Sequence, residues 1–227
     1  MSVDEYHRSI MLAANAPVRT VLVVENDDFL RSLIADALEK AGFSVATAAN
    51  GLDAKRIIRS VDPDAAILDI DLGSGPTGLD IAAQFAITLP EIGIVFLTDL
   101  PDPRFARHAH EVRKNHAYLN KRLVSDSTTL VEAVEAVLKE SNLDDFRHDK
   151  LDNRPLGNLT RTQIEILKLI VEGKTNQQIA DIRNRSLGAT ESAVTRTLEA
   201  LGIERNADLN VRTEAVRVFF HALSSHG

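Results

Sequence analysis

Acidic, hydroxyl and amino side chains follow four of the short apolar runs in the first two thirds of this 227-residue chain. In the stretch "AAILDIDLGSG" the apolar residues Ala65–Leu68 lead directly into Asp69, and Asp71 comes two residues later. Carboxylates are seldom buried without a partner, so this run predicts a strand that ends at a polar site. The comparable side chains are Glu25, Asn26, Asp27 and Asp28 after Thr20–Val24, Thr98 and Asp99 after Ile92–Leu97, and Lys121 after His116–Asn120.

These side-chain types suit the transfer of a phosphoryl group. Proteins bind Mg²⁺ with one or two carboxylates, together with water and substrate oxygens. A carboxylate beside the metal can attack phosphorus, while the metal and a lysine neutralise charge on the transferring group. A threonine hydroxyl can hydrogen-bond a phosphoryl oxygen and move when that oxygen arrives. We therefore interpret the set as a candidate site for a hard cation and a phosphoryl group.

Apolar runs and amphipathic stretches alternate from residue 20 to residue 140. Strands are predicted at 20–24, 43–47, 64–68, 92–97 and 116–120, and helices at 27–42 and near 51–60, 77–89, 102–113 and 126–140. This alternation predicts an α/β fold, in which helices cover both faces of a five-stranded parallel sheet. Ligands of such sheets bind beyond the carboxyl ends of the strands, which is where the polar residues are expected to meet.

The rest of the chain divides into a tail, a linker and a helical region. We interpret residues 1–17 as a mobile N-terminal tail, 18–140 as the α/β domain, 141–155 as a linker that lacks periodicity, and 156–227 as a small all-α domain. Helices are predicted in the last region near 160–172, 175–183, 189–200 and 208–221. Thr160 is expected to cap the first of these helices, and Gly173 to end it.

Composition limits the class of protein and its location. The chain is 44% hydrophobic and 26% charged, which is typical of a globular protein, and no apolar run approaches the roughly 20 residues of a membrane span. The absence of cysteine excludes disulfides and thiolate metal sites, and it fits a cytoplasmic protein. Residues 18–140 carry 19 acidic and 13 basic side chains, whereas residues 154–227 carry 8 and 10. The two regions are therefore expected to have different partners.

Four motifs resemble those of the receiver domain of two-component response regulators. They are "VLVVEND", "AAILDIDL", "IVFLTD" and "AYLNK", in the order and at the spacings of that family, and the similarity covers about residues 18–140. The resemblance implies a flavodoxin-like fold, dependence on Mg²⁺ and a phosphohistidine donor on a sensor histidine kinase. The implied roles are phosphoacceptor for Asp69, metal binding for Glu25, Asn26, Asp69 and Asp71, switching for Thr98 and Tyr118, and phosphate contact for Lys121.

This sequence departs from the receiver pattern at three places. Asn26 stands where the second acid of the pair is normally Asp, so Mg²⁺ affinity is expected to fall, with Asp27 as a partial replacement. Arg122 follows the lysine where proline is usual, and the loop "GSGPTG" after Asp69 is one residue longer than usual. We expect these departures to affect the efficiency of phosphorylation more than the fold.

The stretch "LTRTQIEILKLIVEGKTNQQIA" resembles the opening of LuxR/FixJ-type helix-turn-helix domains, and the similarity covers about residues 156–221. It implies DNA binding by a recognition helix that starts near Leu187. Thr190 stands at a position that is usually valine, and Glu191 at one that is usually basic. The candidates for the DNA-facing side are Thr190, Ser192, Ala193, Thr195, Arg196 and Thr197, supported by the basic residues Arg161, Lys174, Arg183 and Arg185.

Together these patterns predict a response regulator rather than an enzyme. A histidine kinase would phosphorylate Asp69, and the protein would bind DNA as a transcriptional regulator. Arg196 is the only basic residue within the recognition helix, so we expect modest affinity per monomer and reliance on a homodimer.

Two alternatives remain open. Asn26 and Arg122 are compatible with a transcription factor that acts independently of phosphorylation. Glu191 and the small basic surface are compatible with a phospho-accepting protein that acts through protein partners.

Overall fold

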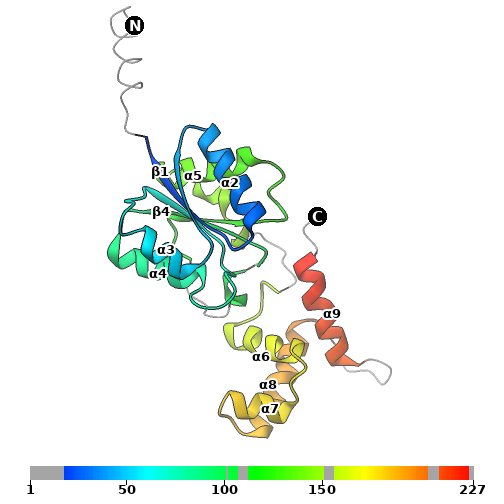
Figure 1. Cartoon of the computed structure of the whole chain (residues 1–227). Coiled ribbons are helices and arrows are strands. Elements are labelled where there is room, and N and C mark those ends of the chain that lie inside the picture. The colour runs from blue at the N-terminus through cyan, green and yellow to red at the C-terminus, as the bar shows by residue number, and fades with distance from the viewer. Residues whose placement is uncertain (1–17, 101, 107–111, 151–155, 204–209, 225–227) are drawn as a thin grey trace, which may run out of the picture.

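Five parallel strands form the centre of the first domain (Figure 1). The computed structural model describes residues 18–100, 102–106, 112–150, 156–203 and 210–224. The sheet has the order β2-β1-β3-β4-β5. Its strands are β1 (Thr20–Val24), β2 (Ser44–Ala48), β3 (Ala65–Leu68), β4 (Gly93–Thr98) and β5 (His116–Asn120). The predicted α/β class and all five strands are confirmed.

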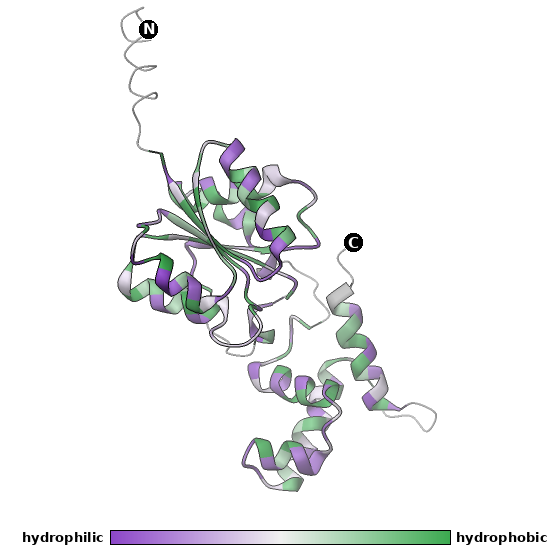
Figure 2. Cartoon of the chain, viewed as in Figure 1, coloured by the Kyte–Doolittle hydropathy of each residue, from purple (hydrophilic) through white to green (hydrophobic). Residues whose placement is uncertain are grey.

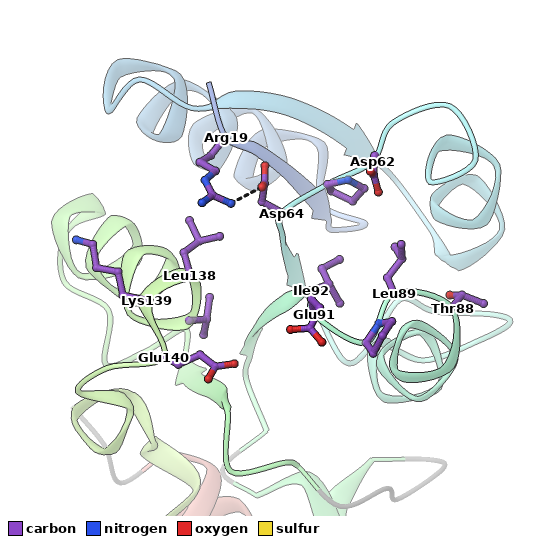
Figure 3. A pocket seen from close by; sticks show the side chains of 13 residues that line it. Arg19, Asp62, Asp64, Thr88, Leu89, Glu91, Ile92, Leu138, Lys139 and Glu140 are labelled. Carbon is purple, nitrogen blue, oxygen red and sulfur yellow. Dashed lines mark hydrogen bonds and ion pairs between the residues drawn. The ribbon is translucent and has the colours of Figure 1, made fainter. Parts of the chain in front are cut away.

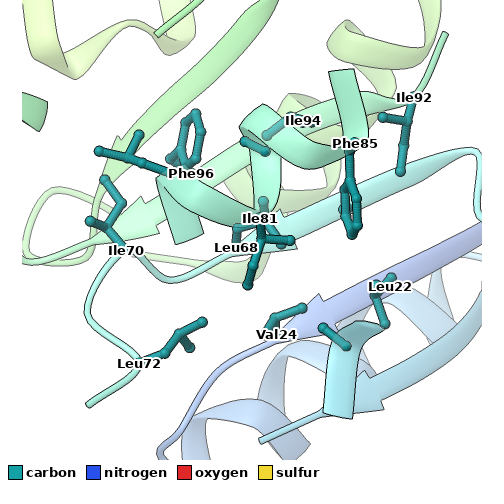
Figure 4. Packing of buried hydrophobic residues seen from close by; sticks show 14 of the residues in the cluster. Leu22, Val24, Leu68, Ile70, Leu72, Ile81, Phe85, Ile92, Ile94 and Phe96 are labelled. Atoms are coloured by element: carbon teal, nitrogen blue, oxygen red, sulfur yellow. The ribbon is translucent and has the colours of Figure 1, made fainter. Parts of the chain in front are cut away.

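Two pairs of helices cover the two faces of the sheet, as Figure 1 shows. α2 (Asp28–Lys40) and α5 (Ser127–Lys139) pack on one face, and α3 (Gly51–Ile57) and α4 (Gly78–Thr88) pack on the other. The strands read as continuous apolar runs because both of their faces are buried. In Figure 4, Phe85 and Ile81 of α4 lie against Leu22, Leu68 and Ile94 of the sheet.

The helix predicted near 102–113 is wrong for the residues that the structure describes. Only the 3-10 helix η1 (Pro103–Phe105) forms, residues 112–115 are not helical, and residues 107–111 lie outside the described residues. Pro103 lacks a backbone N–H and disfavours a helical conformation in the preceding residue. Asp102 accordingly has extended backbone angles (φ −157°, ψ 135°), and its side chain caps η1.

The first part of the predicted linker is folded against β5. It forms two 3-10 helices, η2 (Leu143–Phe146) and η3 (His148–Lys150). Arg147 makes a parallel bridge with Tyr118 and a buried ion pair with Asp149 at 2.7 Å. The Asn120 N–H donates to His148 Nδ1 at 3.1 Å. Residues 141–149 therefore cover the outer edge of the sheet, and residues 151–155 lie outside the described residues.

The last described part of the chain is helical, as predicted. It contains α6 (Arg161–Val171), α7 (Asn176–Ile182), α8 (Leu187–Ala200) and α9 (Val211–Ser224). Thr160 caps α6 in a reciprocal bond pair with Gln163, and Gly173 follows with φ +76°. Hydrophilic and hydrophobic residues are interspersed along these helices in Figure 2, which is the pattern of helices with one buried face. No described helix has the length and hydrophobicity that a membrane crossing requires.

Candidate functional site

Three charged side chains from three strands meet at the carboxyl edge of the sheet. Glu25 follows β1, Asp69 follows β3 and Lys121 follows β5. The Lys121 ammonium donates to Asp69 Oδ2 at 2.9 Å and pairs with Glu25 Oε2 at 2.8 Å. Both carboxylates are buried, with 5% and 2% exposed. The ammonium therefore compensates both acids for the water that they lose on folding.

The environment of Asp69 shifts its protonation. Burial raises the pKa of the Asp69 carboxyl to about 6; Lys121 opposes this rise, and Glu25 adds to it. The Asp71 N–H donates to Asp69 Oδ1 at 3.1 Å and also opposes it. Burial acts to lower the pKa of Lys121, but the two carboxylates outweigh burial and raise that pKa. At neutral pH the site therefore holds an ionised Asp69 beside a charged Lys121.

Thr98 and Tyr118 both hold the backbone of Leu100. Thr98 ends β4, is fully buried, and accepts a hydrogen bond from the Leu100 N–H through Oγ1 at 3.3 Å. Tyr118 is also fully buried, and its hydroxyl donates to the Leu100 carbonyl at 2.8 Å. Two predicted switch residues thus fix one residue of the loop that follows β4.

The donor atoms at this edge fit a hard divalent cation. The described residues contain no cluster of three or more His, Cys, Asp or Glu side chains that could hold a metal. The carboxylates of Glu25 and Asp69 nevertheless lie together, and Asn26 and Asp71 follow them as exposed oxygen-bearing residues. Mg²⁺ requires one or two carboxylates and takes its other ligands from water or substrate.

Asp27, the expected partial replacement for the missing acid at position 26, caps the helix that follows it. Its side chain caps α2 by accepting from the Leu30 N–H at 2.9 Å. Its own N–H donates to Glu25 Oε1 at 3.1 Å. Asp27 thus orients Glu25 through its backbone N–H while its side chain caps α2, and its role as a partial replacement stays a prediction.

Gly78 is a site residue that the sequence reading missed. It begins α4, and its N–H donates to the Ile70 carbonyl at 3.1 Å. A Cβ at this position would lie 2.2 Å from the Asp69 carbonyl oxygen, so only glycine fits. The glycine in "GPTGLD" was a possible signal, but its role depends on how closely α4 approaches Asp69. Gly78 and the Thr77 cap of α4 thus set the loop beside the acid site.

The position after Lys121 carries an exposed charge. Arg122 Nε lies 3.4 Å from Asp99 Oδ1, and both side chains are exposed. The Arg122 N–H donates to Asn120 Oδ1 at 3.0 Å. Arg122 therefore uses the backbone N–H that a proline would lack.

A pocket of about 590 Å³ lies at the opposite edge of the sheet (Figure 3). It is lined by the residues that precede β1, β3 and β4 and by the end of α5. Arg19 and Asp64 form a 2.6 Å ion pair at its side. Because the amino ends of the strands line it, this pocket is separate from the acid site.

The helix-turn-helix candidates divide between an exposed face and the core. On α8, Ser192 and Arg196 are exposed and Thr195 is half-buried. Thr190 and Thr197 are 1% and 0% exposed because they share the buried face of Val194 and Leu198. The expectation that Thr190 and Thr197 face DNA is therefore wrong, and Ala193 is partly buried.

The basic candidates lie at the start of α6 and on both sides of α7. Arg185 and Arg161 are exposed, and Lys174 is half-buried. Arg183 lies 3.4 Å from Glu165, and 15% of its side chain is exposed. These residues lie on the helix-turn-helix unit, with Arg183 already engaged in an ion pair.

Arg212 of α9 is a further residue that the sequence reading missed. Its guanidinium donates to Asn176 Oδ1 at 2.9 Å and to the Lys174 carbonyl. It thereby ties the start of α7 to α9. Nothing in the local sequence pattern indicated this contact, because it joins residues 36 and 38 positions apart.

Comparisons with known proteins find a matching family for each of the two parts of the chain. Residues 21–135 match the model of the response regulator receiver domain, and residues 157–211 match that of the bacterial regulatory proteins of the luxR family. The oxygen regulatory protein NreC of Staphylococcus aureus (strain JH9) is 28% identical over 210 residues, which cover 79% of this chain and 94% of NreC.

Solved structures share the two-part fold. RcsB of Salmonella enterica serovar Typhimurium, bound to promoter rprA with the phosphomimetic BeF3⁻, matches with a TM-score of 0.59 at 19% identity, over 91% of this chain and 99% of that one. Another RcsB–DNA complex matches with a TM-score of 0.56 at 18% identity, over 89% of this chain and 98% of the other. The two family matches show that the chain belongs to the response regulators of two-component systems. It combines a receiver domain with a LuxR-family DNA-binding domain.

Proposed function

We propose that Asp69 accepts a phosphoryl group from the phosphohistidine of a sensor histidine kinase, and that this modification regulates DNA binding by α6–α9. The observation that carries the proposal is the contact of Lys121 Nζ with both Asp69 and Glu25. One ammonium between two buried carboxylates creates a polar site at the edge where parallel sheets bind their ligands.

The proposed reaction is a displacement at phosphorus. An ionised Asp69 oxygen attacks, the new P–O bond forms, the P–N bond to histidine breaks, and the histidine nitrogen takes up a proton. Asp69 is mostly ionised above pH 6 because its pKa is about 6. Lys121 is already within hydrogen-bond distance of Oδ2, so its charge can stabilise the phosphoryl oxygens. The product carries roughly −1.5 to −2 charge at this carboxylate.

Mg²⁺ is the proposed cofactor of this reaction. The carboxylates of Glu25 and Asp69 would hold it, with the Asn26 amide oxygen and Asp71 as the neighbouring donors. When bound, the ion supplies positive charge to the phosphoryl oxygens. Asn26 removes one negative charge from the acid pair, so we expect weaker Mg²⁺ binding than a site with Asp at this position would show.

An exposed apolar surface beside the site supports docking of a kinase. Phe29 and Leu33 of α2 are 79% and 54% exposed. A pocket of about 290 Å³ lies between α2 and α5 and includes Leu33 and Lys121 in its lining. Exposed apolar groups beside a reactive side chain suit a transient protein partner.

The C-terminal helices supply the proposed DNA contact. Ser192, Thr195 and Arg196 would approach base edges, and Lys174, Arg183 and Arg185 would approach phosphates. A homodimer would place two recognition helices about one DNA turn apart. A solved RcsB complex is described as two dimers bound to two parallel DNAs, which supports this assembly.

Replacement of Asp69 by Ala tests the proposal. The full chain would be incubated with a small-molecule phosphodonor and Mg²⁺, and labelling would be followed by intact mass. We expect labelling of the wild type and of the control Asp62→Ala, which changes an exposed acid at the opposite edge of the sheet, and none of Asp69→Ala. A gel shift on genomic fragments should then change with phosphodonor for the wild type and the control, but not for Asp69→Ala. Unchanged labelling of Asp69→Ala would falsify the proposed role.

DNA binding without phosphorylation is a second candidate function. Ser192 and Arg196 are exposed on α8 while the receiver is in place. A gel shift with unmodified protein, with and without beryllofluoride, distinguishes the two functions. Equal affinity in both conditions, despite bound beryllofluoride, would favour the second.

A further inference from the structure

A phenylalanine from the receiver completes the hydrophobic core of the C-terminal domain. Phe105 of η1 is 8% exposed and packs in a cluster made otherwise mainly of residues from α6, α8 and α9. Its ring lies edge-on to Phe219 of α9, with 5.5 Å between ring centroids and 67° between planes. Leu100 also packs against this cluster, and it packs against the receiver core as well.

Charged side chains on both sides of Phe105 bind backbone carbonyls of the opposite domain. Asp102 holds the Arg104 guanidinium at 2.6 Å, and that guanidinium donates to the carbonyls of Leu159 and, at 3.3 Å, Gly157. From the other side, Lys168 Nζ of α6 donates to the carbonyls of Arg104 at 2.9 Å and Ala106 at 2.8 Å. Each domain thus donates hydrogen bonds to backbone carbonyls of the other.

The same segment begins at the residue that Thr98 and Tyr118 hold. Leu100 is bonded through its N–H to Thr98 Oγ1 and through its carbonyl to the Tyr118 hydroxyl. Two residues later, Asp102 caps η1. A change in either hydrogen bond to Leu100 therefore acts on the first residue of the segment that carries Arg104 and Phe105.

We propose that Leu100 and Asp102–Ala106 form an interdomain joint, which unites the two domains into one rigid body. The joint also transmits changes in the hydrogen bonds of Thr98 and Tyr118 to α6 and α9. The joint contacts α6 and α9, whereas Ser192 and Arg196 of α8 stay exposed. The joint thus sets the orientation of the DNA-binding domain without covering the exposed face of α8. The transmission part rests on the proposed function of the acid site.

Pulsed electron paramagnetic resonance on the full chain tests the joint directly. The sequence has no cysteine, so Ser60→Cys on the receiver and Glu172→Cys after α6 allow two specific spin labels at exposed positions. We expect a narrow distance distribution in the otherwise unchanged chain and a broad one after Phe105→Ala. Phe29→Ala is the matched control, because Phe29 is 79% exposed on α2, and it should leave the distribution narrow.

A second variant keeps the test valid if Phe105→Ala folds poorly. Lys168→Met keeps the aliphatic stem and removes the ammonium with its two hydrogen bonds to the carbonyls of Arg104 and Ala106, so it should also broaden the distribution. A narrow distribution in both variants, with folding verified by circular dichroism, would overturn the rigid joint.

A separate variant tests whether a change at Tyr118 reaches the joint through Leu100. Tyr118→Phe removes the bond to Leu100 without changing Asp69, Glu25 or Lys121, and it should shift or broaden the distance distribution. An unchanged distribution would overturn the transmission route while leaving the joint intact. Because no arm of this experiment uses a phosphodonor, failure of Asp69 labelling and failure of the joint are distinguishable.

Discussion

Asp69 is held in a buried position that favours its protonated form. The folded protein keeps the pKa of this carboxyl near 6, against 3.8 for the unperturbed group, because burial outweighs the attraction of Lys121. The folded state therefore binds more protons than the unfolded chain between these values, and stability falls as pH rises from about 4 to 6. The ionised, buried Asp69 carboxylate therefore lowers the stability of the receiver at neutral pH.

Replacement of Asp69 by Asn should remove this penalty. We expect the variant to be more stable than the wild type at pH 8 by at most about 3 kcal/mol, the equivalent of a shift of about two pKa units. The difference should shrink through pH 6 and vanish below pH 4, where both side chains are neutral. Urea denaturation at several pH values measures this, and a constant difference across the range would contradict it.

Gly78 provides a second test at the scale of one residue. Alanine there would place a Cβ 2.2 Å from the Asp69 carbonyl oxygen, so α4 or the acid site must move. We expect Gly78→Ala to lose about 1–3 kcal/mol of stability, as overpacked sites do, and to slow labelling of Asp69.

Gly188→Ala is the control for Gly78→Ala. No atom lies within 4 Å of a Cβ at Gly188, and its backbone is helical. Alanine there should stabilise α8 by about 0.5–1 kcal/mol. Denaturation midpoints and labelling rates compare the two variants, and equal effects would rule out a special role for Gly78.

At the scale of an element, α8 combines the side chains proposed to face DNA with exposed acidic residues. Glu191 and Glu199 are exposed on this helix, together with Ser192 and Arg196. Carboxylates near the phosphate backbone oppose binding, although an acid can accept a hydrogen bond from the amino group of cytosine. If α8 faces DNA as proposed, we expect its acidic residues to lower the non-specific affinity for DNA.

Replacement of Glu191 by Lys should strengthen binding to DNA of any sequence. The change removes one negative charge and adds one positive charge beside the phosphates. We therefore expect the slope of log K against log salt concentration to steepen by the equivalent of about one to two phosphate contacts. Glu132→Lys on α5 makes the same change in net charge on an exposed receiver helix and should have little effect. Fluorescence anisotropy at several salt concentrations measures both, and equal gains would contradict a DNA-facing Glu191.

At the scale of the whole molecule, the joint predicts cooperative unfolding. Phe105 of the receiver packs in the core of the C-terminal domain, and loss of a buried phenylalanine ring costs about 3–5 kcal/mol. We expect the wild type to unfold in urea in one transition and Phe105→Ala in two, with Phe29→Ala behaving as wild type. Circular dichroism follows the transitions, and a single transition in Phe105→Ala would contradict the prediction.

The sequence by itself determined the α/β alternation, the four C-terminal helices and the meeting of Glu25, Asp69 and Lys121. These follow from local periodicity and from one rule of geometry: parallel strands place their carboxyl ends on the same edge. Only the tertiary structure decided that Thr190 is buried, that Gly78 contacts the Asp69 backbone and that Phe105 enters the other domain. Such features depend on which surfaces meet, and contacts between residues far apart in sequence leave no local pattern.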